Sequence, residues 1–99
     1  MALKDQIQQD TKDALRAGDK DRLSVLRMTL AAIKQREVDE RTDMGDPEVT
    51  AIIEKMVKQR RESVTQYEAG GRQDLADKEA AEIEILKAYL PEPLSDAEL

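Results

Sequence analysis

The chain has 99 residues, of which 38% are charged, and its net charge at neutral pH is −6. It contains no Cys and no His, which excludes a disulfide framework, a thiolate or imidazole metal site and a Ser-His-Asp triad. The only aromatic residues are two tyrosines, and no segment alternates between apolar and polar residues as a β-strand does. We therefore predict an all-α fold, a small bundle of four helices.

The first two predicted helices cover residues 3–17 and 20–40, where apolar residues recur at helical spacing. Gly18 is suited to end the first helix in a left-handed conformation, and Asp19 is suited to cap the second. The side chains that we expect to face the core are Leu3, Ile7, Thr11, Ala14 and Leu15 in the first helix, and Leu23, Leu26, Leu30 and Ile33 in the second.

The third predicted helix begins at Asp46-Pro47-Glu48, with Asp46 as its N-cap, and ends before Gly70-Gly71. The fourth covers residues 72–89, and we expect it to fold back on the third as an antiparallel hairpin. The apolar side chains that would line this hairpin are Ile53, Met56, Val57, Val64 and Tyr67, together with Leu75, Ile83, Leu86, Tyr89 and Leu90.

Charged residues fall inside both apolar arcs of this hairpin: Arg60 in the third helix, and Glu79 and Glu82 in the fourth. At a rise of 1.5 Å per residue, Arg60 lies roughly 15 Å from the turn, and the two acids lie roughly 12 and 16 Å from it. We therefore predict a partly buried ion pair between Arg60 and Glu79 or Glu82, which Arg27 of the second helix would join. Its predicted role is structural, and we predict no catalytic residue, metal or cofactor.

A run of basic residues is the candidate nucleic-acid contact, formed by Lys55, Lys58 and Arg61 of the third helix and Arg72 just past the turn. Without stacking aromatics, it would contact phosphates or RNA shape rather than read bases. The alternative interpretation is a solvated helix face whose cations pair with Glu54 and Glu62.

The charge distribution and the lack of long apolar segments predict where the protein is located and what it does not bind. Residues 1–72 carry 14 basic and 14 acidic residues, whereas residues 73–99 carry 8 acidic and 2 basic ones. No apolar run approaches 18 residues and the N-terminus lacks a signal peptide, so we expect a soluble, monomeric, cytosolic protein with no membrane partner. The end of the sequence predicts a domain boundary. Two prolines interrupt the chain in Leu90-Pro91-Glu92-Pro93, and a capping box follows in Ser95-Asp96-Ala97-Glu98. We therefore predict one domain over residues 1–91, then a linker and the first turn of a second, truncated helical domain over residues 92–99.

Three motifs resemble those of YqeY proteins over nearly the whole chain: Leu26-Arg27-Met28, the turn from Ala69 to Leu75, and the ending from Ile85 to Pro91. The resemblance implies a helical N-terminal domain followed by a second helical domain that is similar to the tail of the GatB subunit of the tRNA-dependent amidotransferase. It also implies an association with carbon–nitrogen ligase activity that uses glutamine as amido donor. In the amidotransferase, the tail helps to hold tRNA while other domains carry out the chemistry.

Taken with the resemblance, the sequence favours an accessory module that assists tRNA-dependent amidation or binds tRNA-like RNA. The alternative is a non-enzymatic interaction module that docks on an amidotransferase or synthetase through its acidic end. A free-standing ligase is disfavoured, because we find neither an ammonia-generating nucleophile nor a nucleotide-phosphate loop.

Overall fold

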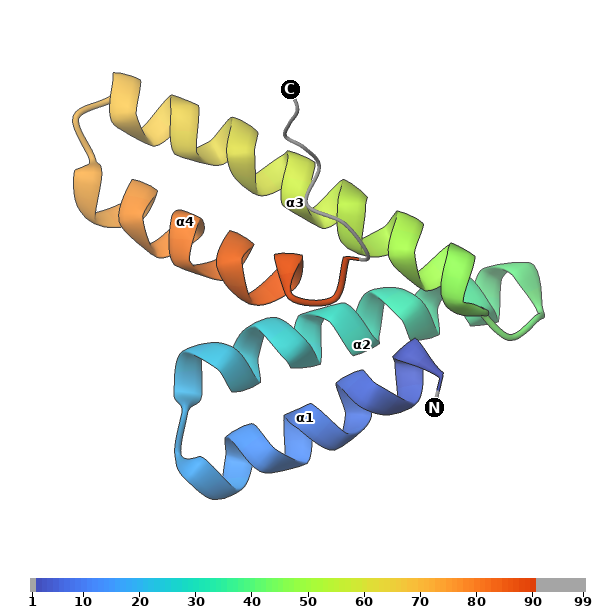
Figure 1. Cartoon of the computed structure of the whole chain (residues 1–99). Coiled ribbons are helices and arrows are strands. Elements are labelled where there is room, and N and C mark those ends of the chain that lie inside the picture. The colour runs from blue at the N-terminus through green and yellow to red at the C-terminus, as the bar shows by residue number, and fades with distance from the viewer. Residues whose placement is uncertain (1, 91–99) are drawn as a thin grey trace. The chain divides into compact units, whose positions relative to one another are not determined.

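Four helices form the protein in a computed structural model that describes residues 2–90. They are α1 (Leu3–Ala17), α2 (Lys20–Glu40), α3 (Asp46–Ala69) and α4 (Gln73–Lys87), as Figure 1 shows. No strand occurs in residues 2–90, so the all-α prediction is confirmed. The chain divides into two compact units, Met1–Ile52 and Ile53–Leu99, with the boundary inside α3.

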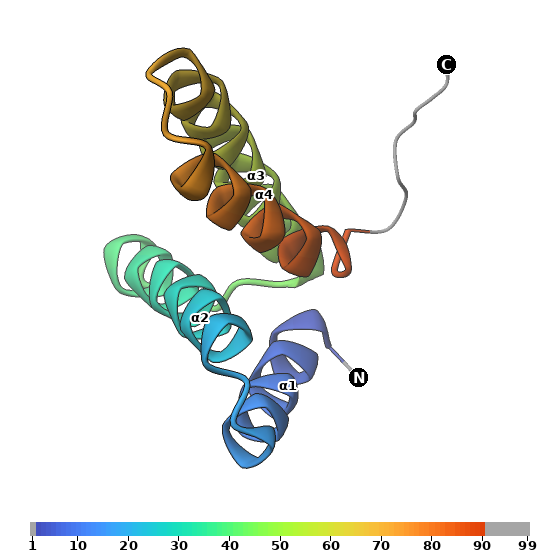
Figure 2. The ribbon, with the colours of Figure 1, turned by 90° about the vertical axis from the view of Figure 1, so that its left-hand side faces the viewer.

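In the first unit, α1 and α2 pack on each other as a hairpin (Figure 2). Gly18 connects them in the left-handed conformation with φ of 72°, where glycine has no Cβ to clash. Its N–H donates to the carbonyl of Leu15 at 3.2 Å, and the N–H of Asp19 donates to that of Ala14 at 3.0 Å. The carboxylate of Asp19 then accepts from the N–H of Arg22 at 3.2 Å. Both predicted caps are confirmed.

The buried side of this hairpin differs in part from the predicted one. Leu15 is 58% exposed, so its predicted core position is wrong, whereas Ala14, also predicted there, is buried. Neighbouring side chains leave a helix about 100° apart, so the two do not both point into the core. In α2, Leu23 and Leu30 are only half-buried. The fully buried positions of α2 belong to Val25, Leu26, Thr29 and Ile33.

The start of α3 also corrects a prediction. Asp46 does not cap its own helix; its Oδ1 accepts a hydrogen bond from the N–H of Leu3 at 2.9 Å, at the start of α1. Gly45 occupies the flanking position instead, because its carbonyl accepts from the N–H of Val49 at 2.9 Å. The side chain of Glu48 completes the start by accepting from the N–H of Gly45 at 3.1 Å.

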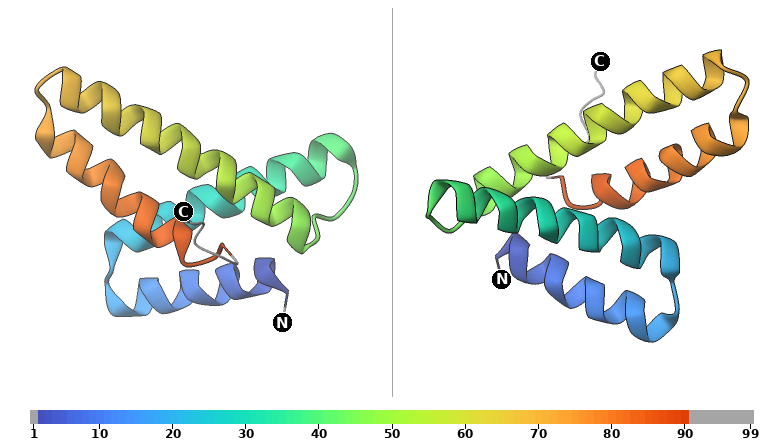
Figure 3. Two further views of the ribbon diagram at one scale, coloured as in Figure 1. Left: turned by 45° about the horizontal axis from the view of Figure 1, so that its top comes forward. Right: turned by 180° about the vertical axis from the view of Figure 1, so that it is seen from behind.

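In the second unit, α3 and α4 run antiparallel as the predicted hairpin, and Figure 3 shows the same arrangement from two other sides. Gly71 makes the turn with φ of 74°. The N–H of Arg72 donates to the carbonyl of Tyr67 at 2.8 Å, so α3 ends in a Schellman motif. The buried side chains of this unit are Ile53, Met56, Val57, Arg60, Ala76, Ile83 and Leu86.

The predicted capping box at Ser95–Glu98 and the domain division at residue 91 lie outside the described residues. The second helical domain therefore stays a prediction.

Candidate nucleic-acid interface

Three cations project from the exposed side of α3. Lys55, Lys58 and Arg61 are exposed, whereas Met56 and Arg60 between them are buried. Residues three apart lie about 4.5 Å from each other along the helix axis, and their side chains leave the helix in directions about 60° apart. The three cations therefore share one side of α3 over a length of about 9 Å. We call this set the α3 basic face.

None of these three side chains makes an ion pair with any residue in the range 2–90. Glu54 and Glu62 are exposed on the same side of α3 but are not within pairing distance of the cations. The described structure therefore contains no ion pair of the kind that the alternative interpretation requires.

Arg72, the fourth predicted contact, is exposed at the turn but is bound to a carboxylate. Its Nε and Nη2 lie 3.3 and 3.2 Å from the two carboxylate oxygens of Asp74. The hydrogen bond from Arg72 holds the pKa of Asp74 below its ordinary value of 3.8. The positive charge of Arg72 is therefore partly balanced, unlike the charges of the α3 basic face.

The structure brings together Arg60 and Glu82 inside the α3–α4 hairpin. Arg60 Nε donates to Glu82 Oε1 at 2.9 Å, and the two side chains are only 10% and 12% exposed. The other oxygen of Glu82 lies 3.7 Å from Lys78 Nζ. Glu79 is half-buried one turn earlier on α4, and Arg27 is exposed on α2 in the first unit. The neighbouring cations and the burial suit Glu82 to holding two helices together rather than to proton transfer.

A second ion pair, which the sequence analysis missed, joins the start of α1 to the end of α2. Glu37 accepts from Lys4 Nζ at 2.6 Å and from the N–H of Met44 at 3.1 Å. Its hydrogen bond with Lys4, and then that with Met44, lowers the pKa of Glu37 below 4.5, while the same pair raises the pKa of Lys4 above 10.5. A signal was present, because Glu37 follows buried Ile33 by four residues and so continues the buried side of α2.

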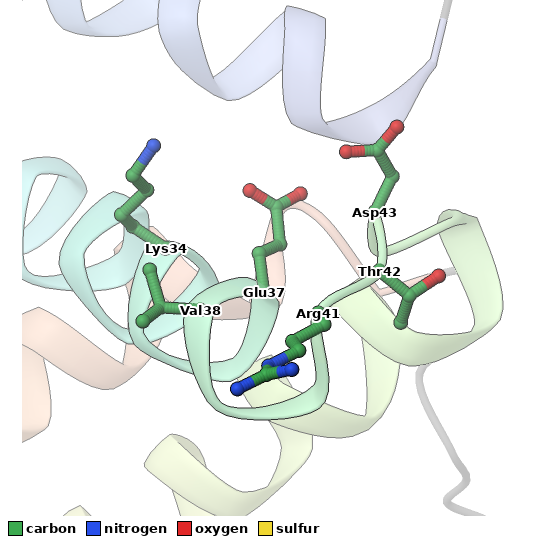
Figure 4. A pocket seen from close by; sticks show the side chains of 6 residues that line it. All are labelled: Lys34, Glu37, Val38, Arg41, Thr42 and Asp43. Atoms are coloured by element: carbon green, nitrogen blue, oxygen red, sulfur yellow. The ribbon is translucent and has the colours of Figure 1, made fainter.

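An open pocket of about 460 Å³ lies beside this pair, at the end of α2. Figure 4 shows the carboxylates of Glu37 and Asp43 pointing toward α1, with Arg41 and Thr42 turned to the other side. Arg41 adopts a left-handed conformation with φ of 55°, which is unusual for a residue with a Cβ. The remaining lining residues are Lys34 and Val38.

Residues 2–90 lack two other kinds of feature. No group of three or more acidic side chains is placed to hold a metal ion. None of the described helices combines the length and the apolar character needed to cross a bilayer.

Comparison with known proteins gives relatives over most of the chain. The chain is 37% identical over 94 residues to "Altered inheritance of mitochondria protein 41, mitochondrial" of Eremothecium gossypii, covering 93% of this chain and 51% of that protein. Proteins of the same name in Kluyveromyces lactis and Candida glabrata are 34% and 33% identical, over 84% and 93% of this chain and 45% and 52% of their own length. The chain thus spans about half the length of these curated relatives.

These names contradict the predicted cytosolic location, since all three relatives are named as mitochondrial proteins. The prediction rested on the lack of a signal peptide and of a membrane span, and neither feature distinguishes the cytosol from the mitochondrion. The sequence model of the family described as Yqey-like protein matches residues 4–99, and the chain therefore belongs to the YqeY family.

Proposed function

We propose that this YqeY-family chain is an accessory module that binds tRNA-like RNA through the α3 basic face and assists tRNA-dependent amidation. The observation that carries the proposal is the set of three adjacent, exposed cations without a carboxylate partner in the described structure. A cation that is already paired must give up its partner to bind a phosphate, whereas Lys55, Lys58 and Arg61 have no such partner to lose.

The residues of the α3 basic face determine which part of an RNA it can contact. No aromatic side chain accompanies the cations, because both tyrosines of the chain, Tyr67 and Tyr89, are half-buried. Contact would therefore be with backbone phosphates, with little base discrimination. With three phosphates neutralised, the logarithm of affinity should fall with the logarithm of salt concentration with a slope of about −2 to −3.

The amidation part of the proposal is supported by membership of the YqeY family, whose resemblance implies a second domain similar to the GatB tail, which helps to hold tRNA while other domains react. The side chains of this chain fit such a division of labour. It has neither Cys nor His, and the buried carboxylate of Glu82 is bound to Arg60. A partner enzyme would supply the nucleophile and the activated substrate.

The test is fluorescence anisotropy of labelled tRNA with the full 99-residue chain and a charge-reversal variant, K55E/K58E/R61E. We expect the variant to bind at least about tenfold more weakly, because three phosphate contacts become repulsive. The matched control is K20E/R27E/K34E, which reverses three exposed cations on α2 and should change affinity by less than about threefold. Equal tRNA affinity of the chain and K55E/K58E/R61E would contradict the proposal.

A further inference from the structure

We propose that the exposed side of α2 is a docking surface for an acidic amphipathic helix of a partner protein. The surface consists of a row of cations and, beside it, an uncharged strip; we call it the α2 docking face. It is separate in sequence and charge pattern from the α3 basic face.

The row of cations consists of Lys20, Arg27 and Lys34, which follow one another at seven-residue intervals. Seven residues make nearly two helical turns, so the three side chains leave α2 in nearly the same direction, about 10.5 Å apart along the axis. All three are exposed, and none pairs with a carboxylate anywhere in residues 2–90. Three exposed charges of one sign in a line attract a partner with the opposite charge at the same interval.

The uncharged strip lies directly beside this row. Ser24, Ala31 and Val38 repeat at the same seven-residue interval, each four residues after a cation, and all are exposed. Val38, the large aliphatic residue of this series, is 59% exposed. No charged residue interrupts the strip between Ser24 and Val38, because Met28 and Gln35 fill the two remaining positions. Small side chains at two of its positions allow another helix to approach closely.

The two-sided character of α2 supports a second packing partner. Its buried residues Leu26 and Ile33 lie roughly opposite the strip, at 100° per residue. A surface helix that packs on one side only normally carries charged residues on the other. On α2, the strip opposite the buried residues is instead uncharged, and cations at heptad spacing flank it on one side, as they flank one edge of a coiled-coil contact.

The pattern favours a helix over a nucleic acid as the occupant. Phosphates would use the cations but would gain nothing from Val38 or from the small side chain of Ala31. A helix uses both features, because its aliphatic residues cover the strip while its Asp or Glu residues, seven apart, meet the cations. At the end of the strip, Lys34 and Val38 also line the open pocket shown in Figure 4, and its other lining residues are charged or polar, so it offers space for a polar side chain of the partner.

The experiment uses two labelled peptides of about 28 residues with identical composition. One places Leu at the core positions and Glu at heptad-spaced flanking positions, and the other is its scramble. Binding of each to the full 99-residue chain is measured by fluorescence anisotropy. We expect the heptad peptide to bind at least about tenfold more tightly than the scramble, because only its charges match the row in register.

Three variants locate the contact. K20E/R27E/K34E should weaken peptide binding by about tenfold or more, and Ala31→Gln, which adds no charge, should weaken it by about fivefold by blocking close approach. The matched control K55E/K58E/R61E should leave peptide affinity unchanged within about twofold. All substituted positions are exposed, and circular dichroism of each variant should show the helical content of the unsubstituted chain.

Several outcomes would overturn the inference. Equal binding of the scramble, or equal weakening by K55E/K58E/R61E, would show attraction by net charge alone. Loss of tRNA binding in K20E/R27E/K34E, with no effect of Ala31→Gln, would assign the face to nucleic acid. Concentration-dependent association in sedimentation, abolished by K20E/R27E/K34E, would make the occupant a second copy. Failure of the proposed RNA-binding function would appear in a different measurement, namely equal tRNA affinity of the unsubstituted chain and K55E/K58E/R61E.

Discussion

Arg60 Nε lies 2.9 Å from Glu82 Oε1, and this ion pair connects α3 to α4 where both side chains are nearly shielded from water. Charges in such surroundings are costly to bury, and they are tolerated only while each has its partner. We therefore expect the pair to stabilise one register of the hairpin, because a shift of either helix by one residue would separate the two charges.

Glu82→Ala should lower the free energy of unfolding by about 3 kcal/mol, because it leaves the Arg60 guanidinium buried without this carboxylate. Chemical denaturation monitored by circular dichroism measures the change. The matched control is Glu84→Ala on the same helix; Glu84 is exposed and pairs with Lys87, so it should cost less than about 0.5 kcal/mol. The double variant R60M/E82M should recover most of the loss, and equal effects of Glu82→Ala and Glu84→Ala would refute a stabilising role for the pair.

The Lys4–Glu37 pair should make stability depend on pH at both extremes. The pKa of Glu37 is lowered below 4.5, so its contribution is present above that pH and is lost as the pH falls through the lowered pKa. The pKa of Lys4 is raised above 10.5, so its contribution is present below that pH and is lost as the pH rises through the raised pKa.

Thermal unfolding against pH tests this behaviour. In Glu37→Gln the melting temperature should be lower at neutral pH and should fall less steeply in acid than in the unsubstituted chain. Glu40→Gln is the matched control, since Glu40 is exposed on the same helix and pairs with Arg36, four residues away. Parallel acid profiles for Glu37→Gln and the unsubstituted chain would show that the pair does not contribute.

Arg41→Gly should stabilise the protein by about 0.5–1 kcal/mol. Arg41 ends α2 with φ of 55°, a conformation in which a Cβ costs roughly 1 kcal/mol and glycine is the favoured residue. The carbonyl of Glu37 would still accept from the N–H of Thr42, at 3.2 Å, because that bond involves no side chain. Arg41→Ala separates the two effects: it removes the guanidinium but keeps the Cβ, so it should not stabilise. Equal unfolding energies for the glycine and alanine variants would contradict the prediction.

Asp74→Asn should strengthen tRNA binding by about twofold to threefold, because it releases Arg72 from its carboxylate beside the turn. Anisotropy at fixed ionic strength measures the affinity. Asp77→Asn controls for the loss of one negative charge, since Asp77 lies on the same helix and accepts from Gln73 rather than from Arg72. If both variants bind tRNA equally well, net charge rather than the release of Arg72 explains any gain.

The sequence by itself determined the four helices and most of their ends, because the signals involved are local. Apolar spacing and the turns at Gly18 and Gly71 act within a few residues of the backbone that they shape. The register of the α3–α4 hairpin could also be predicted, since a short turn relates the positions of Arg60 and Glu82 by simple distance along two helices.

Only the tertiary structure decided which local candidates take on longer-range roles. Asp46 looked like a cap for its own helix, yet its partner is the N–H of Leu3, 43 residues away in the sequence. Glu37 and Lys4 are 33 residues apart, and of the two neighbours expected in the core, Ala14 is buried but Leu15 is exposed. Spacing along one helix specifies a direction around its axis, but the neighbour found in that direction depends on how separate segments pack.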